Sequence, residues 1–198
     1  MKHIISVDKK NCIGCKMCVE VLLNAIRKRR SIRKFKDRKV LDEVINNIIE
    51  AGRWTPTGKN SQGVSYIIID KNKCKLEDMA VRLFKKLIKI IGIFQKSFRD
   101  MEIDDDFFFK KAPIAMEVVC NNDVDGSLAA SNMALMAESY GLGVLYSGFF
   151  SFASRISPKL KRNLGVKKGR VVTTLVIGYP DVKYKRTLQI EKSKVIYK

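Results

Sequence analysis

Histidine is nearly absent from this chain, whose 198 residues include one, His3. A Ser-His-Asp triad is therefore not expected. No apolar run approaches the length of about 18 residues that a membrane-spanning helix needs. The segment from Met1 to Asn11 lacks the apolar core of a secretory signal, so a cytoplasmic location is expected. Glycine and proline are not enriched, with 12 and 4 residues, which argues against extensive disorder.

Acidic residues are few compared with basic ones. The formal net charge is +19, with 39 lysines and arginines against 20 acidic residues. Such a balance attracts polyanions, which include nucleic acids. The basic residues are spread along the whole chain, however, and isoleucine, asparagine and lysine are all abundant, as in a general compositional bias. We therefore favour a small anionic cofactor over nucleic acid as the partner of this charge, and keep a basic nucleic-acid-binding module as an alternative.

The spacing of apolar residues predicts an α+β fold with a sheet of about four strands. Helices and strands are mixed along the chain, and residues 100–112 form an acidic and aromatic loop. Helices are predicted over 20–30, 41–54, 75–98, 125–140 and from Ser157-Pro158 to Gly165, and strands over 4–7, 65–70, 114–120 and 171–178.

A basic run follows the first predicted helix. Arg29, Ser31 and Arg33 alternate, so their side chains point the same way if this stretch is extended. Guanidinium groups bind phosphate and carbonyl oxygens through charge-assisted hydrogen bonds. The alternative is an ordinary solvated basic run at the end of a helix.

Two further segments carry polar groups suited to a flat ligand. Thr55–Gln62 is a loop whose Asn60 amide can donate and accept hydrogen bonds, although ordinary turns have similar compositions. The segment Asp125–Gly143 is followed by Tyr146-Ser147-Gly148, where glycine would let a ligand approach the backbone. A buried core helix that ends at a glycine is the alternative reading.

Taken in order, the runs RRSIRKF, PTGKNSQ, DGSLAASNMALMAESYGLGVLYSGF and VVTTLVIGYPDVKYKR resemble the nitroreductase family over about residues 24–190. The resemblance implies an α+β fold with a central, mostly antiparallel or mixed sheet flanked by helices. It also implies an intertwined homodimer that holds two FMN molecules at its interface, each touched by both subunits.

The resemblance also implies roles for individual residues. Arg29, Ser31 and Arg33 match the positions that hold the FMN phosphate, ribityl chain and ring carbonyl, and Arg30 lies between them. The remaining cofactor-binding residues that it implies are Pro56, Thr57 and Asn60 beside the ring, Ser147 and Gly148 near the flavin N5 edge, and Lys185 and Arg186 near the phosphate.

The sequence departs from the family pattern in two places. The loop after Gln62 continues with Gly63-Val64 where Pro-Trp is usual, and the tail has Leu188–Ile190 where a Pro-x-Arg is usual. The second departure leaves open which tail residue contacts the phosphate, with Lys192 as a further candidate.

Cys12, Cys15 and Cys18 form a C-x2-C-x2-C run that resembles half of a bacterial ferredoxin, although leucines stand where the fourth cysteine and its proline belong. We therefore divide the chain into a truncated ferredoxin-like segment, 1–23, and a nitroreductase-like FMN-binding domain, 24–198. Three readings stay open: a segment without a cluster, an iron–sulfur cluster completed by Cys74, Cys120 or an outside ligand, and a zinc site.

The expected reaction is ping-pong hydride transfer, in which NAD(P)H reduces the flavin and a nitroaromatic, quinone or similar acceptor then takes the electrons. Arg33 is expected to support the reaction from the carbonyl edge of the ring. Phe107–Phe109 are expected either to wall the flavin face or to pack in the dimer. Electron entry through an N-terminal iron–sulfur cluster is the alternative to NAD(P)H.

Overall fold

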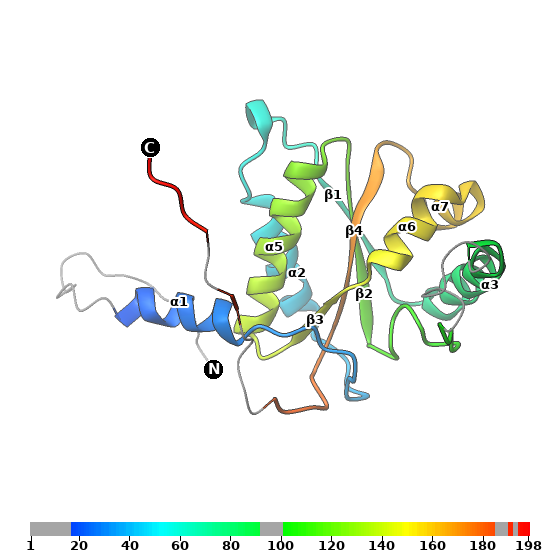
Figure 1. The fold of residues 1–198 in the computed structure, drawn as a ribbon, viewed down its shortest axis with the longest axis horizontal. Helices are drawn as coiled ribbons and strands as arrows, with labels where there is room; N and C mark the ends of the chain where they lie inside the picture. The colour runs from blue at the N-terminus through cyan, green and yellow to red at the C-terminus, as the bar shows by residue number, and fades with distance from the viewer. Residues whose placement is uncertain (1–16, 92–100, 185–189, 192–193) are drawn as a thin grey trace.

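The computed structural model describes residues 17–91, 101–184, 190–191 and 194–198. Figure 1 shows helices and strands mixed along this part of the chain. In chain order the elements are α1 (Met17–Lys28), α2 (Asp42–Arg53), the short 3-10 helix η1 (Gly58–Asn60), β1 (Ser65–Ile69), α3 (Lys73–Ile91), β2 (Ile114–Cys120), α5 (Asp123–Ser139), β3 (Gly143–Tyr146), α6 (Gly148–Ile156), α7 (Pro158–Leu164) and β4 (Arg170–Gly178).

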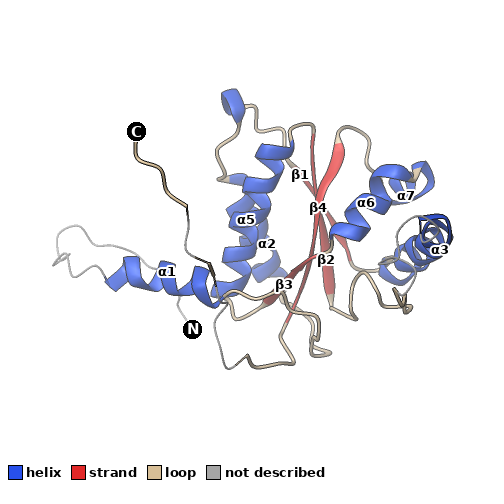
Figure 2. Cartoon of the chain, in the orientation of Figure 1, coloured by secondary structure: helices blue, strands red, loops and turns tan. Residues whose placement is uncertain are grey.

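The described strands form one antiparallel sheet in the order β1-β2-β4-β3. Helices α2 and α5 cover one face, and α3, α6 and α7 cover the other (Figure 2). Each face therefore has its own hydrophobic core, and the sheet lies between them as the middle of three layers. The predicted α+β class with helices flanking a mostly antiparallel sheet is confirmed.

Strand β2 is the most deeply buried element, because neighbouring strands pair with both of its edges and helices cover both of its faces. All seven of its residues are buried. By contrast β1 is an edge strand, and Ile68 is 42% exposed. The continuous apolar run over 66–69 is typical of a strand covered on both faces. Ile67 and Tyr66 do pack against the cores on opposite faces, whereas Ile68 stays partly exposed on this outer strand.

Helix α7 begins and ends as its sequence predicts. The Ser157 hydroxyl accepts the Leu160 backbone N–H at 3.1 Å, and Pro158 occupies the first turn, where no intrahelical donor is needed. Gly165 then ends the helix with φ 75°, a left-handed conformation that glycine adopts without strain. The predicted helices over 20–30, 41–54, 75–98 and 125–140 correspond to α1, α2, α3 and α5, with ends shifted by a few residues, and the stretch 92–98 lies outside the described residues.

Strand β3 and helix α6 were not predicted as separate elements. β3 is four residues long, too short for alternation to be recognised, and α6 follows it after the single residue Ser147. The strand predicted at 4–7 lies outside the described residues. The predicted domain boundary between residues 23 and 24 falls within α1, and the division itself remains a prediction.

The segment after α1 lies against β3. Ser31 forms a parallel bridge with Val144, and the Ile32 N–H donates to the Val144 carbonyl at 3.1 Å. Ile32 itself is 5% exposed. This approach requires glycine at position 143, because a Cβ there would overlap the Ile32 side chain and lie 3.0 Å from Pro180 Cγ. Gly143 thus lets the basic segment reach the sheet.

No helix within the described parts of the chain is long and apolar enough to cross a membrane.

The substitution Gly143→Ala should lower the free energy of unfolding by roughly 1–3 kcal/mol, because the added methyl group overpacks the contact with Ile32. Urea denaturation measures this change. Gly63→Ala is the matched control, since the nearest atom to its added Cβ is the Ser61 hydroxyl oxygen at an ordinary 3.8 Å. Equal stability of the two variants would contradict the assigned role of Gly143.

Candidate functional site

A cavity of about 620 Å³ opens where β3 passes into α6. Its volume lies within the range of small-molecule sites. Arg33 and the pair Ser147-Gly148 line it together, although they are more than 100 residues apart in sequence. The remaining lining is mostly apolar and comes from α3, α6, β3 and the loop before β2: Phe84, Leu87, Ile88, Phe107, Lys110, Leu145, Tyr146, Phe149 and Phe152.

The first residues of α6 are fixed to the sheet through Ser147. The Ser147 N–H donates to the Thr174 carbonyl of β4 at 2.9 Å, and the Ser147 carbonyl accepts the backbone N–H groups of Phe150 and Ser151, both at 3.1 Å. Gly148, the next residue, is exposed, and a Cβ added to it would meet nothing within 4 Å. The turn thus offers open backbone at the start of a helix, where positive partial charge gathers.

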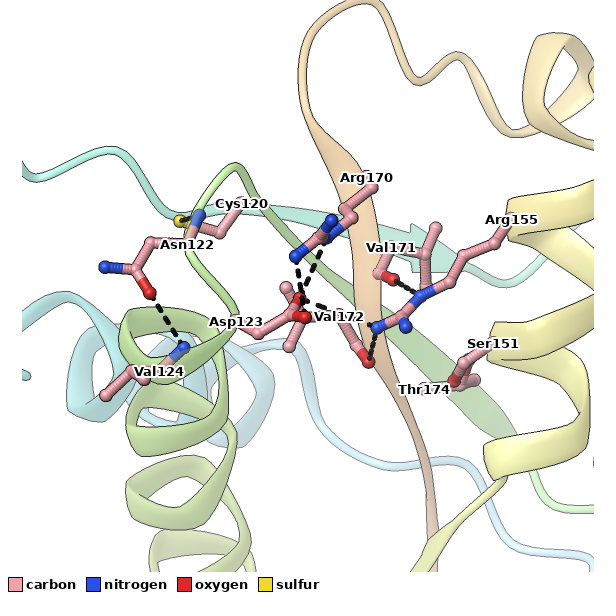
Figure 3. Close-up of polar contacts among 10 residues, drawn as sticks. All are labelled: Cys120, Asn122, Asp123, Val124, Ser151, Arg155, Arg170, Val171, Val172 and Thr174. Carbon is pink, nitrogen blue, oxygen red and sulfur yellow. Dashed lines mark hydrogen bonds and ion pairs between the residues drawn. The ribbon is translucent and has the colours of Figure 1, made fainter.

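The other end of α6 is tied to β4 by Arg155. Its Nε and Nη2 atoms donate to the carbonyls of Val171 and Val172, at 2.6 and 2.8 Å (Figure 3). Asp123, at the start of α5, lies 3.6 Å from the Arg155 guanidinium and also accepts two hydrogen bonds from Arg170 at 3.0 and 2.7 Å. These contacts connect α6, β4 and α5, so α6 is held along its length.

Isolated β-bridges at Ser31 and Phe35 fit an extended backbone for the basic run, but its residues have different surroundings. Arg33 is exposed and lines the cavity, and Ser31 is exposed beside β3. Arg29 is half-buried near Glu138 and Tyr146, and its charge partly offsets the rise that burial causes in the pKa of each. The Arg30 guanidinium lies 5.3 Å from the centre of the Tyr184 ring, within cation–π range.

The three phenylalanines of the loop before β2 divide between cavity and core. Phe107 lines the cavity, and its role as a wall of the flavin face remains a prediction. Phe108 and Phe109 are 1% and 0% exposed and pack against Phe150 inside their own chain. They therefore belong to the core, a role that neither reading anticipated.

A buried carboxylate anchors this loop. Glu77 of α3 accepts the backbone N–H groups of Phe108 and Phe109 on one oxygen, at 3.0 and 2.8 Å. Burial raises the pKa of Glu77 to about 7, although the two N–H donors and nearby Lys73 act against that rise. Lys73 itself donates to the Ala112 carbonyl at the end of the loop. The position of Phe107 at the cavity thus depends on α3.

Pro56, Thr57 and Asn60 do not line this cavity. They lie in the loop around η1, where the Gly58 N–H donates to Asp125 at the beginning of α5, at 3.1 Å. Pro56 and Asn60 are exposed, and Thr57 lines a separate cavity of about 360 Å³. Three non-glycine residues of the loop have positive φ, namely Lys59 at 54°, Asn60 at 52° and Gln62 at 48°. Such conformations cluster at binding sites.

The two predicted groups therefore occupy opposite ends of α5. The loop with Asn60 is hydrogen-bonded to Asp125 in the first turn of α5, whereas Arg29 lies near Glu138 in the last turn of that helix. A helix of 17 residues is about 25 Å long. Figure 1 shows the same separation of η1 from the segment that follows α1. One chain by itself thus keeps Asn60 away from Arg29 and the cavity.

Several predicted residues lie outside the described part of the chain, namely Lys185, Arg186, Cys12 and Cys15. For Cys18 only the backbone, in α1, is described. The metal site at these cysteines therefore remains a prediction, and no group of three or more metal-ligating side chains occurs among the described residues. Cys74 is exposed and Cys120 is buried.

Sequence reasoning missed the contributions of α3, Lys110 and Phe152 to the cavity. The helix predicted over 75–98 was given no part in a site, yet Phe84, Leu87 and Ile88 of α3 line the cavity. The spacing of Phe149 and Phe152 on one helical face was the signal that could have revealed the α6 wall.

Comparisons with known proteins agree with this architecture. The sequence profile described as "Nitroreductase family" matches residues 26–179. A putative NADH dehydrogenase/NAD(P)H nitroreductase from Methanothermobacter thermautotrophicus is 26% identical over 170 residues, which are 80% of this chain and 77% of that protein. NADPH-dependent oxidoreductases from Staphylococcus aureus are 26% identical to this chain over 136 residues, which are 65% of this chain. The matched residues span about half (53%) of the length of those proteins.

Among solved structures, a nitroreductase with bound FMN from Bacteroides fragilis has the same fold. Its TM-score against this chain is 0.72, over 89% of this chain and 98% of that one, at 20% identity. At 20% sequence identity, this structural similarity shows a shared fold and nothing finer.

The pKa of Glu77 predicts how stability depends on pH. Because burial raises it above the unfolded value of 4.5 to about 7, the fold favours the protonated form, and stability should fall as pH rises through this interval. Glu77→Gln stays neutral and keeps an oxygen for the two N–H groups. Urea denaturation from pH 5 to pH 8 should show the variant losing less stability than the wild type, by roughly 2–3 kcal/mol.

Glu77→Ala serves as the comparison for this experiment, because it loses both hydrogen bonds and should be less stable than Glu77→Gln at every pH. Identical pH profiles for the wild type and Glu77→Gln would show that Glu77 does not titrate in this range.

Proposed function

The chain belongs to the nitroreductase family, and on this basis we propose that it is an FMN-dependent oxidoreductase that uses NAD(P)H to reduce a nitroaromatic, quinone or similar acceptor. The observation that supports this most directly is the cavity that Arg33 shares with Ser147 and Gly148. When bound, FMN would supply the hydride transfer that none of the described side chains can perform.

The residues at the cavity suit the flavin ring. A flat, largely apolar ring needs apolar contact on its face, which Phe107, Phe149 and Leu145 can supply. Its polar edge needs donors, which the Arg33 guanidinium and the open backbone at Gly148 can supply. The chemistry of this donor set therefore fits the cofactor, and the +19 net charge suits its phosphate.

Each part of the site has a separate task in this proposal. Arg33 places a permanent positive charge beside the ring carbonyls and thereby favours negative charge there. The open backbone at Gly148 presents a donor at the edge where hydride is exchanged, while the Ser147 N–H holds the turn to Thr174. Arg29 and Ser31 precede Arg33 in the same extended segment and are proposed to hold the ribityl chain and phosphate, with Arg30 beside them. The apolar wall excludes water from the reacting face.

The loop with Pro56, Thr57 and Asn60 is proposed to complete the site of a second protomer. Its strained backbone suggests a binding loop, yet within one chain it lies at the far end of α5 from Arg29. A homodimer in which each cofactor contacts both subunits resolves this separation. Exposed apolar side chains on α1 and α5 offer surface for such an interface: Leu22, Leu23, Ile26, Val124 and Leu128.

The visible absorption spectrum of protein purified without oxygen tests the proposed function. We expect the bands of oxidised flavin, release of FMN on denaturation, and bleaching when NADH or NADPH is added. Arg33→Ala should weaken FMN binding about tenfold or more, because it removes a charge-assisted contact worth about 1.5–3 kcal/mol.

Other outcomes of this measurement favour the alternatives. An additional broad iron–sulfur shoulder would indicate a cluster at Cys12, Cys15 and Cys18. A colourless protein that takes up no added FMN would overturn the proposal, and salt-sensitive binding to DNA or RNA would then favour the basic nucleic-acid-binding module.

Mixed dimers test whether the site is shared. Arg33→Ala and Asn60→Ala homodimers should each bind FMN weakly, because both of their sites carry a defect. In a heterodimer of the two variants, one site carries both defects and the other carries none. Heterodimers isolated with two different affinity tags should therefore regain tight binding at half of their sites. No regained binding would show that both residues serve the same protomer's site. Tight binding by the Asn60→Ala homodimer itself would show that Asn60 does not contact FMN.

A further inference from the structure

Glu117 is a carboxyl group buried at the centre of the sheet. It interrupts the apolar strand β2 and is 0% exposed. Thr174 Oγ1, on the neighbouring strand β4, lies 2.9 Å from its Oε2 atom. Its Oε1 atom has no hydrogen-bond partner among the residues that the structure describes. A charged carboxylate in this position would be costly, because desolvation is compensated by a single donor.

A chain of hydroxyl groups leads from this carboxyl to the cavity. Thr174 Oγ1 lies 2.9 Å from Ser151 Oγ of α6, and Ser151 Oγ lies 3.1 Å from the Ser147 carbonyl oxygen. Figure 3 shows Ser151 and Thr174 meeting between α6 and β4. All three side-chain groups are buried, and the chain ends at the residue that precedes Gly148 at the cavity.

The number of protons that can fill the hydrogen bonds of this chain depends on whether the Glu117 carboxyl is protonated. The chain has three links, and each hydroxyl carries one proton. When the carboxyl is protonated it donates to Thr174, Thr174 donates to Ser151, and Ser151 donates to the Ser147 carbonyl, so every link is filled. When the carboxyl is charged, Thr174 must donate to it. The single proton of Ser151 then serves either Thr174 or Ser147, and one link is lost.

We propose that Glu117 is a positioning residue for the cavity, whose proton completes the hydroxyl chain that holds the Ser147-Gly148 turn. In the protonated state the turn and the first residues of α6 are held firmly against β4. In the charged state either the Thr174–Ser151 contact between β4 and α6 or the Ser151–Ser147 contact is lost, and the turn is less well ordered. The effect on cofactor affinity rests on the proposed function, whereas the effect on the turn does not.

The surroundings of Glu117 support a protonated group near neutral pH. Burial raises the pKa of Glu117 to about 8, and the Thr174 hydroxyl acts against that rise. On the elements packed over this face, Arg155 of α6 binds the Val171 and Val172 carbonyls and Glu77 of α3 binds the loop before β2. The other charged residues of α3 and α7 in the described structure are exposed or half-buried: Lys73, Lys75, Asp78, Arg82, Lys85, Lys86, Lys89, Lys159, Lys161 and Arg162.

Four variants separate the links of the chain. Glu117→Gln keeps the size and a donor but stays neutral, and it mimics the protonated acid. Thr174→Val and Ser151→Ala each break the chain while leaving the carboxyl. Ser154→Ala is the matched control, because Ser154 is equally buried on α6 and donates to the Phe150 carbonyl at 2.8 Å, outside the chain.

FMN affinity and amide hydrogen exchange of residues 145–152 should be measured from about pH 6 to about pH 9, the interval around the raised pKa. In the wild type, affinity should fall several-fold and the turn should exchange faster, after correction for intrinsic rates, as pH rises through about 8. Glu117→Gln should remove both changes. Ser151→Ala and Thr174→Val should bind weakly throughout with flat profiles, and Ser154→Ala should follow the wild type.

The proposal fails if Glu117→Gln keeps the pH dependence of the wild type, or if Ser151→Ala and Ser154→Ala behave alike. Either outcome would leave Glu117 with a purely structural role. A wild-type protein that binds no FMN would instead overturn the proposed function. The exchange of the turn would still decide whether Glu117 positions it, because that readout needs no cofactor.

Discussion

Strand β4 hydrogen-bonds to β2 along one edge and to β3 along the other, and the position of the cavity depends on this double pairing. The pairing brings the end of β3 beside Thr174, whose main-chain carbonyl accepts the Ser147 N–H. The same strand receives Arg155 from the other end of α6. A slip of one residue in β4 would turn Thr174 toward the opposite core and remove the hydroxyl from α6.

The basic segment reaches the cavity through a contact with β3 that depends on residue size. Gly143 leaves room for Ile32, and the bridge between Ser31 and Val144 then sets the direction of the extended backbone. Arg33 consequently emerges at the cavity while Arg29 stays near the end of α5. The loop with Asn60 is fixed at the opposite end of that helix through Asp125. A site shared between two protomers, as proposed above, would account for this arrangement.

Two carboxyl groups in the core connect this geometry to pH. Glu77 and Glu117 lie on the side of the sheet covered by α3, α6 and α7, and burial raises the pKa of both. Apolar residues at these positions would avoid the cost of desolvation. Each carboxyl group instead holds a segment that borders the cavity: Glu77 holds the loop with Phe107, and Glu117 contacts the hydroxyl chain to Ser147. The two buried carboxyl groups thus lower the stability of the fold while they order the segments that border the cavity.

The sequence alone determined the elements with long, regular patterns. The stripes of α2 and α3, the apolar run of β2 and the end signals of α7 depend on neighbours in the chain, so they could be read in advance. The resemblance in motifs led to Arg33, Ser147 and Gly148. Only the tertiary structure decided that these three share a cavity, that Phe107 separates from Phe108 and Phe109, and that Asn60 lies elsewhere. Strand pairing, close packing and desolvation join residues far apart in the chain, and no local pattern records which ones meet.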